Sequence, residues 1–198
     1  MTSQLSTSMF SWTSAADLGH DARMEAARLV RSERGLRANG YLVTVGDSAA
    51  GSWYSLMCDP AGQLRRLTVR ADSAIGERSL SLARAPGGPW VLDRADGEQA
   101  EPALAAVDDV VLGGSVLSHA LPIHRHAIHT GDEGSSQTIE VAVVSIPDLS
   151  VSLEHITYTT AAKGQDGSAE ISVTCNDVGT IVPVDANGII AGAVNLRV

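Results

Sequence analysis

The stretch "WYSLMCD", residues 53–59, decides how the chain is read, because its apolar and polar side chains alternate. Alternation of this length is typical of a β-strand with one face turned toward a core. The same period returns in "RRLTVR" (65–70) and "ERSLSLAR" (77–84), and turn residues separate the segments at fairly regular spacing. We therefore predict a mainly β fold, whose first inward-facing side chains are Tyr54, Leu56 and Cys58.

Composition limits the classes of function. The chain has 198 residues, of which 44% are hydrophobic and 19% charged, values typical of a folded globular protein. Aromatic residues are few, so aliphatic side chains must fill the core. A net charge of -9 argues against binding to nucleic acid or to an anionic bilayer, and the longest basic run is only Arg65-Arg66. A local basic site stays compatible with this charge.

Targeting and redox signals point to the cytoplasm. The first residues, "MTSQLSTSMFSW", lack the charged and apolar regions of a signal peptide, and no apolar run reaches the ~18 residues of a spanning helix. We therefore expect a cytoplasmic protein that is not integral to the membrane. Cys58 and Cys175 are expected to be buried free thiols, since two cysteines make no disulfide framework.

The sequence predicts an internal repeat within one domain spanning residues 1–198. Residues 36–97 and 138–198 each contain a strand closed by proline (Pro60 or Pro147), two further strands, and a strand that ends in an Asp- and Gly-containing turn. These turns are "DRADG" and "DANG". Residues 98–137 join the two halves. Neither half alone would bury enough apolar surface to be stable, so the two are expected to share a core.

Three of the six histidines lie in "LPIHRHAIH", residues 121–129. If this segment is a strand, His124 and His126 share a face, and such a pair can supply two ligands to zinc, copper or iron. A metal site needs a third ligand, and His129 would point to the other face. We therefore predict no metal here and interpret the pair as lying on a polar strand face beside a pocket. A metal-dependent, hydrolase-like enzyme is the alternative.

Other polar residues predict no catalytic site. Asp108 and Asp109 would point to opposite faces of a strand, which favours capping or ion pairing over shared acid–base chemistry. Cys58 has no neighbouring base, and Ser115 and Ser118 lack the G-x-S-x-G elbow of a hydrolase nucleophile. The segment "RAPGGPW" (84–90) reads as a hairpin turn. We predict neither catalytic residues nor a cofactor.

Several motifs resemble one family. These are "DDVVL" (108–112), "LPIHR" (121–125), "VVSIPDLSV" (143–151) with the later Tyr158, the upstream "YSLMCD" (54–59), and Trp90. Together they resemble the putative glycolipid-binding protein family of bacteria, and the likeness runs from about residue 36 to the end. The chain departs from the family pattern in "GGSVLSHA" (113–120) and in carrying His126 where a second arginine is usual.

The resemblance implies a fold. That fold is an antiparallel β-roll or open barrel of two similar halves with an apolar interior, as in carriers of lipoproteins and glycolipids. It also bears on residues 22–34, where a capping Asp21, good helix formers and Gly35 favour a helix by propensity. The resemblance implies strands there instead, and we follow it because tertiary context often overrides propensity.

The resulting functional hypothesis is a non-enzymatic binding protein for a lipid or glycolipid-like amphiphile. The acyl chain would lie among aliphatic side chains inside the roll, where each buried CH₂ contributes about 0.8 kcal/mol. An interaction module with a filled interior is a further alternative, since Leu and Val line hollow and filled rolls alike. The predicted ligand contacts are aromatic residues framing the mouth, Trp53, Trp90 and Tyr158, and polar groups beside it, His124, Arg125 and His126.

Overall fold

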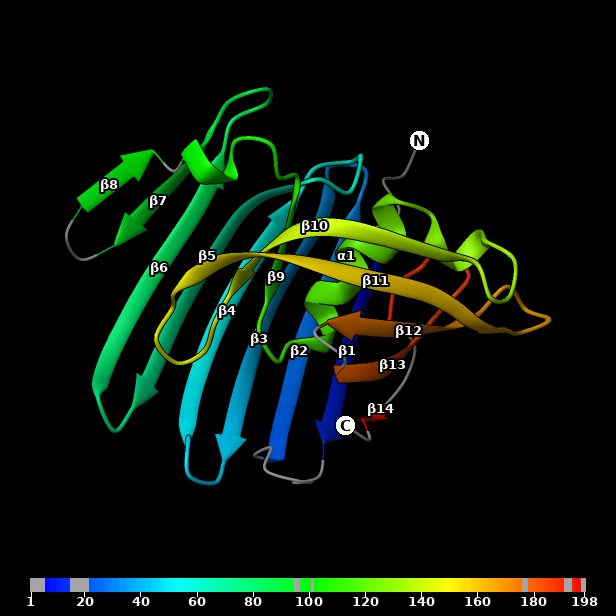
Figure 1. Ribbon diagram of the computed structural model, residues 1–198, viewed down its shortest axis with the longest axis horizontal. Helices are drawn as coiled ribbons and strands as arrows, with labels where there is room; N and C mark the ends of the chain where they lie inside the picture. Colours follow the sequence, from blue (N-terminus) through cyan, green and yellow to red (C-terminus); the bar gives the residue numbers. More distant parts are fainter. Residues whose placement is uncertain are drawn as a thin grey trace.

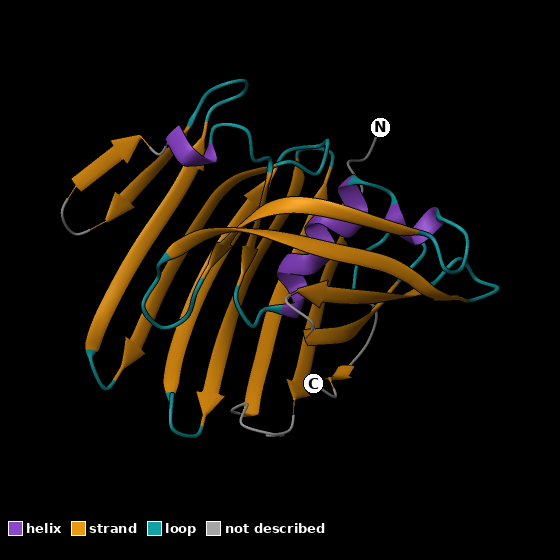
Figure 2. Cartoon of the chain, in the orientation of Figure 1, coloured by secondary structure: helices purple, strands orange, loops and turns teal. Residues whose placement is uncertain are grey.

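In a computed structural model, the described part of the chain forms two β-sheets with one α-helix between them (Figures 1 and 2). The structure describes residues 6–14, 22–94, 97–100, 102–175, 178–190 and 194–196. The predicted mainly β class is confirmed: a large, almost wholly antiparallel sheet is crossed by a smaller curled sheet.

The larger sheet has nine strands in the order β14-β1-β2-β3-β4-β5-β6-β7-β8. Each strand from β1 to β8 pairs antiparallel with the next, and β14 pairs parallel with β1. Their bounds are β1 Ser6–Ser14, β2 Ala22–Ser32, β3 Gly35–Val45, β4 Ala50–Cys58, β5 Leu64–Ser73, β6 Gly76–Arg84, β7 Trp90–Arg94, β8 Gly97–Ala100 and β14 Val194–Leu196.

The smaller sheet has the order β13-β12-β11-β10-β9, in which β9 runs parallel to β10 and the other pairs are antiparallel. Two short 3₁₀ helices, η1 (Pro102–Leu104) and η2 (Ile128–Thr130), lie in the connections. The strands are β9 Asp109–Leu112, β10 Ser136–Val144, β11 Val151–Lys163, β12 Ala169–Cys175 and β13 Val178–Val184.

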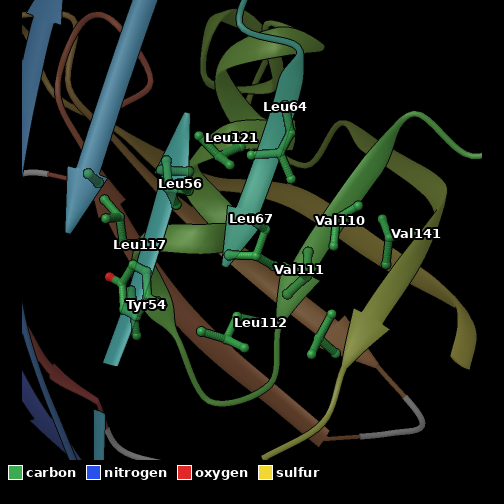
Figure 3. Packing of buried hydrophobic residues seen from close by; sticks show 14 of the residues in the cluster. Tyr54, Leu56, Leu64, Leu67, Val110, Val111, Leu112, Leu117, Leu121 and Val141 are labelled. Atoms are coloured by element: carbon green, nitrogen blue, oxygen red, sulfur yellow. The ribbon is translucent and has the colours of Figure 1, made fainter. Parts of the chain in front are cut away.

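Helix α1 (Val116–Arg125) fills the space between the sheets (Figure 3). Leu117 and Leu121 of the helix pack beside inward side chains of β4, β5 and β9, among them Tyr54, Leu67 and Leu112. The alternation that predicted the strands also predicted their buried face, since every one of these inward residues is at most 5% exposed. The interior around Leu67 and Leu121 holds no space for even one water molecule. This part of the roll is filled rather than hollow.

The prediction that residues 121–129 form a strand is wrong, because they contain the end of α1 and the η2 turn. Proline inside a helix removes a backbone hydrogen bond, so Pro122 disfavours a helix in this segment. Here packing outweighs that cost, since seven of the ten helical residues are buried. The helix also has a polar cap: Ser115 Oγ accepts from the N–H of Ser118 at 3.1 Å.

Residues 22–32 form strand β2, as the family resemblance implied and helix propensity did not. Its side chains at positions 24, 26 and 28 are exposed on the outer face, and Glu25, Ala27 and Leu29 are buried on the inner face. Pairing with β1 and β3, together with burial of every second residue on the inner face, outweighs local helix propensity here.

The single-domain organisation and the internal repeat stay predictions. Strands β4 to β7 and strands β10 to β13 each form a four-stranded antiparallel meander, but Ala95 and Asp96 of the first repeat turn lie outside the described residues. Both cysteines are free, as expected. Cys58 is buried, but Cys175 is half-buried, so its predicted burial is wrong.

Candidate functional site

A groove of about 570 Å³ opens at one rim of the nine-stranded sheet. It lies where β2 and β4 end and β3 begins, and α1 and the 185–188 turn form its other wall. Volumes of this size are typical of sites for one small ligand. The lining residues are Ser6, Arg31, Ser32, Gly35, Leu36, Cys58, Asp59, Pro60, Gly62, Leu121, His124 and Asn187.

The groove combines apolar and charged walls. Leu36 and Leu121 are buried side chains whose edges reach it, and Cys58 lies beneath them. The rim needs glycine at Gly35, where φ is +108° and a Cβ atom would lie 2.2 Å from the carbonyl oxygen of Cys58. This close approach of β3 to the end of β4 shapes the floor of the groove.

The charged residues of the groove differ in the hydrogen bonds and ion pairs that they make. Asp59 accepts from the N–H groups of Ala61 and Gln63 and pairs with Arg65 at 2.6 Å. Burial would raise the pKa of Asp59, but the hydrogen bonds from Arg65 and the turn lower it below its ordinary value. Arg31, in contrast, makes no ion pair among the described residues. It is therefore the cation that can meet a ligand.

His124 forms the wall opposite the sheet. Its Nδ1 lies 2.6 Å from the carbonyl oxygen of Asn187, which links the end of α1 to the 185–188 turn. Gly62 lies under the imidazole, where an added Cβ atom would come within 3.1 Å of Cδ2. The contact leaves Nε2 as the ring atom available to a ligand.

A buried carboxyl anchors the N-terminal end of α1. Glu25 of β2 is 2% exposed and accepts hydrogen bonds from Ser115 Oγ at 2.8 Å, from the N–H of Val116 at 2.7 Å, and from the Tyr54 hydroxyl. Burial raises the pKa of Glu25 to about 7, although these three hydrogen bonds oppose the rise. No cation is among the groups that shift it.

Tyr54 reaches Glu25 by crossing a glycine. Gly40 of β3 lies directly opposite Tyr54 of β4, and a Cβ atom at Gly40 would lie 2.3 Å from the tyrosine ring. The ring therefore occupies the space of a missing side chain. This glycine serves packing rather than backbone freedom.

An ion-pair network anchors the C-terminal end of α1. Arg125 donates from Nε and Nη2 to Asp109, at 2.9 and 2.5 Å, and from Nη1 to Asp108 at 3.4 Å. His126 Nε2 lies 2.8 Å from Asp109, and Arg84 pairs with Asp108 at 2.6 Å. The predicted ion pairing of the two aspartates is confirmed, but their predicted divergence is wrong. Only Asp109 belongs to β9, so both carboxylates reach one guanidinium.

The structure does not bring the predicted ligand contacts together. Trp90 and Tyr158 are fully buried: Trp90 Nε1 donates to the carbonyl of Val107 at 2.8 Å, and the Tyr158 hydroxyl lies 3.1 Å from Nδ1 of His119. Trp53 lies on the outer face of the sheet, opposite the groove. Of the six predicted residues, His124 lines the groove, and the ligand role of all six stays a prediction.

The metal-site alternative required two histidines on one face of a strand, and the structure does not have that arrangement. His124 and His126 do not share a strand face, because they lie at the end of α1 and bond to different partners, Asn187 and Asp109. Within the described part of the chain, no three His, Cys, Asp or Glu side chains are arranged to hold a metal ion.

Sequence reasoning missed Glu25, Arg31 and Asn187. Glu25 and Arg31 are two of the inward positions of β2, a signal that only the strand interpretation of residues 22–32 reveals. Asn187 lies in the "DANG" turn, which served in the sequence only as the turn that ends a strand of the predicted repeat. None of the described helices is long and apolar enough to cross a membrane.

Comparison with known proteins places the chain in a family. A solved structure of a DUF1089 family protein from Pseudomonas aeruginosa matches with a TM-score of 0.68 and 21% identity, covering 88% of this chain and 91% of that one. A β-barrel-like protein of the DUF1849 domain from Brucella abortus matches with a TM-score of 0.50 and 9% identity, covering 86% and 81%. No curated protein matches. The family profile described as "Putative glycolipid-binding" matches residues 9–196, and the chain therefore belongs to this family.

Proposed function

We propose that the protein binds a glycolipid-like amphiphile, without chemical change, in the groove between the sheet rim and α1. The observation that carries the proposal is the groove itself, which joins an apolar floor at Leu36 and Leu121 to Arg31, a cation with no ion pair among the described residues. The family name supports a ligand of this class.

The sequence-based hypothesis put the acyl chain inside the roll, and we propose a site at the rim instead. Because α1 occupies the space between the sheets, an acyl chain would lie along Leu36 and Leu121 at the rim. Each CH₂ that leaves water there contributes about 0.8 kcal/mol, so a few methylenes are enough for weak binding. Arg31, His124 and Asn187 would contact the polar head group.

The polar groups of the groove favour holding a ligand over reacting with it. Burial raises the pKa of the Cys58 thiol to about 12, so this cysteine is not a thiolate nucleophile at neutral pH. Asp59 is engaged by Arg65 and by its own turn. Cys58 and Asp59 therefore do not form an activated nucleophile with its base.

Two structurally matched serines provide the test. Ser32 lines the groove in the β2–β3 turn, where its Oγ bonds to the N–H of Arg34 and the carbonyl of Gly35. Ser73 makes the same two contacts, to Ile75 and Gly76, in the β5–β6 turn at the opposite rim.

We expect Ser32→Trp to fill the groove and weaken the binding of dodecyl maltoside, below its micelle concentration, by about tenfold or more in calorimetry. Ser73→Trp should bind like the unchanged protein, and both variants should melt alike. Equal affinity of all three proteins, or no binding by any, would refute the proposal.

A further inference from the structure

The outer face of strands β2 to β5 is not covered by any other described element. Its side chains are the alternate residues that point away from α1 and the smaller sheet, and they are exposed or half-buried. Figure 1 shows the helix and the smaller sheet on the same side of the large sheet. The opposite side is thus a broad, open surface.

Large apolar side chains gather on this outer face. Met24 of β2 lies opposite Val43 of β3, and Tyr41 of β3 lies opposite Trp53 of β4. Tyr41 is 61% exposed and Met24 53% exposed. Adjacent pairs on one face make a contiguous patch rather than scattered apolar residues.

Four arginines surround the patch. Arg70 lies opposite Trp53, while Arg37 and Arg66 flank Met57 across three strands. Arg28 is the outward arginine of β2. All four are exposed, and none forms an ion pair with a described residue. Asp72 is the single acidic residue at the outward positions of these four strands.

This distribution runs against the net charge of the chain, which is -9. The outer face of β2 to β5 carries four arginines and one carboxylate, so its local charge is positive. The whole-chain charge argued against an anionic bilayer, but attraction to a surface depends on the charges within about a Debye length of it. The local face is cationic.

We propose that the outer face of β2 to β5 docks on an anionic lipid bilayer. Tyrosine and tryptophan favour the membrane–water interface, and each basic residue near an anionic surface strengthens attachment. A second copy fits less well, because a symmetric contact would place exposed arginines against one another. The groove opens at the rim close to Arg37 and Arg66, so a docked protein would hold its mouth near the lipid.

The test uses sedimentation with phosphatidylcholine vesicles, with and without phosphatidylglycerol. We expect binding only to the anionic vesicles, and its loss at high salt. The variant Arg37→Gln, Arg66→Gln and Arg70→Gln should reduce the partition coefficient by about a hundredfold. Arg78→Gln is the control, since Arg78 lies opposite Ala71 on the other face of the sheet. Tyr41→Ser should weaken binding to the anionic vesicles at low salt, because it removes an exposed aromatic side chain from the patch.

Four results would overturn the proposal. The first is equal binding by the triple variant and the Arg78→Gln control, and the second is no binding by the unchanged protein. The third is a dimer in sedimentation equilibrium that Tyr41→Ser dissociates, which would assign the face to a second copy. The fourth is binding to polyglutamate but not to anionic vesicles, which would assign it to an acidic protein. Ser32→Trp should bind vesicles normally, which separates this proposal from the groove.

Discussion

The two ends of helix α1 are anchored by opposite kinds of interaction. At the N-terminal end, one buried carboxyl, Glu25, accepts three hydrogen bonds, none of them from a cation. At the C-terminal end, Arg125 lies among two carboxylates and His126, and its side chain is 20% exposed. Buried donors that lose their acceptor stay unsatisfied, whereas the partly exposed guanidinium of Arg125 can bond to water when it loses a partner.

The contrast also predicts different responses to pH. Burial raises the pKa of Glu25 to about 7, so the N-terminal anchor titrates near neutrality. Burial would raise the pKa of Asp108, but the hydrogen bond from Arg84 and the charge of Arg125 lower it below its ordinary value. The Asp108 carboxylate of the C-terminal anchor therefore stays charged to a lower pH than an ordinary aspartate does.

The largest expected effect comes from removing the N-terminal anchor. Glu25→Ala leaves the buried donors of Tyr54, Ser115 and Val116 without an acceptor, and we expect a loss of about 4 kcal/mol in the free energy of unfolding. Urea denaturation followed by tryptophan fluorescence measures it. Glu25→Gln, which keeps the shape and one acceptor, should cost less than half as much. A loss below about 1 kcal/mol for Glu25→Ala would remove the contrast between the two ends.

The second prediction concerns pH. With a pKa of about 7 in the folded state and 4.5 when unfolded, Glu25 binds more protons folded than unfolded between these values. Its contribution to stability is complete below pH 4.5 and is lost as the pH rises through 7, by about 3 kcal/mol in all. Denaturation across this range should show the decline in the unchanged protein and not in Glu25→Gln. A decline that survives in Glu25→Gln must come from another group.

A smaller loss is expected at the other end. Asp109→Ala removes two hydrogen bonds from Arg125 and one contact of His126, but Asp108 stays within 3.4 Å of the guanidinium. We expect a loss of about 2 kcal/mol, because Arg125 can turn toward water. The measurement is the same denaturation curve. If Asp109→Ala lowers the free energy of unfolding as much as Glu25→Ala does, Arg125 does not replace its lost partner with water, and the contrast between the two ends is wrong.

The smallest effect is expected for His124→Ala. The imidazole contacts the 185–188 turn through one hydrogen bond at a half-exposed position, so the free energy of unfolding should change by about 0.5 kcal/mol. Affinity for dodecyl maltoside should fall a fewfold at most, since the alkyl chain supplies most of the binding. A large fall in thermal stability would show that His124 mainly holds the C-terminal end of α1 in place.

The sequence predicted the strands better than the helix for a physical reason. Period-two alternation in β4, β5 and β6 is read directly from residues such as Tyr54, Leu67 and Leu82, because one face of each is buried. Helix α1 instead contains Pro122 and depends on tertiary burial. A capping Ser115 after two glycines and apolar residues at helical spacing were the available signals.

The groove was less predictable than the fold. It is assembled from the ends of four strands, one helix and two turns, several of which are far apart in the chain. Local pattern therefore directed attention to the histidines of 121–129 and recovered only His124. The buried role of Glu25 was hidden for a similar reason, since its three partners come from β4 and from the start of α1.

The most direct test of the proposed groove is photolabelling with an alkyl glycoside that carries a diazirine in its alkyl chain. The labelled peptides, identified by mass spectrometry, should contain Leu36, Pro60 or Leu121, and excess dodecyl maltoside should prevent the labelling. Ser32→Trp should lose the label, while Ser73→Trp keeps it. Labelling confined to the outer face around Tyr41 and Trp53, or unaffected by Ser32→Trp, would contradict binding in the groove.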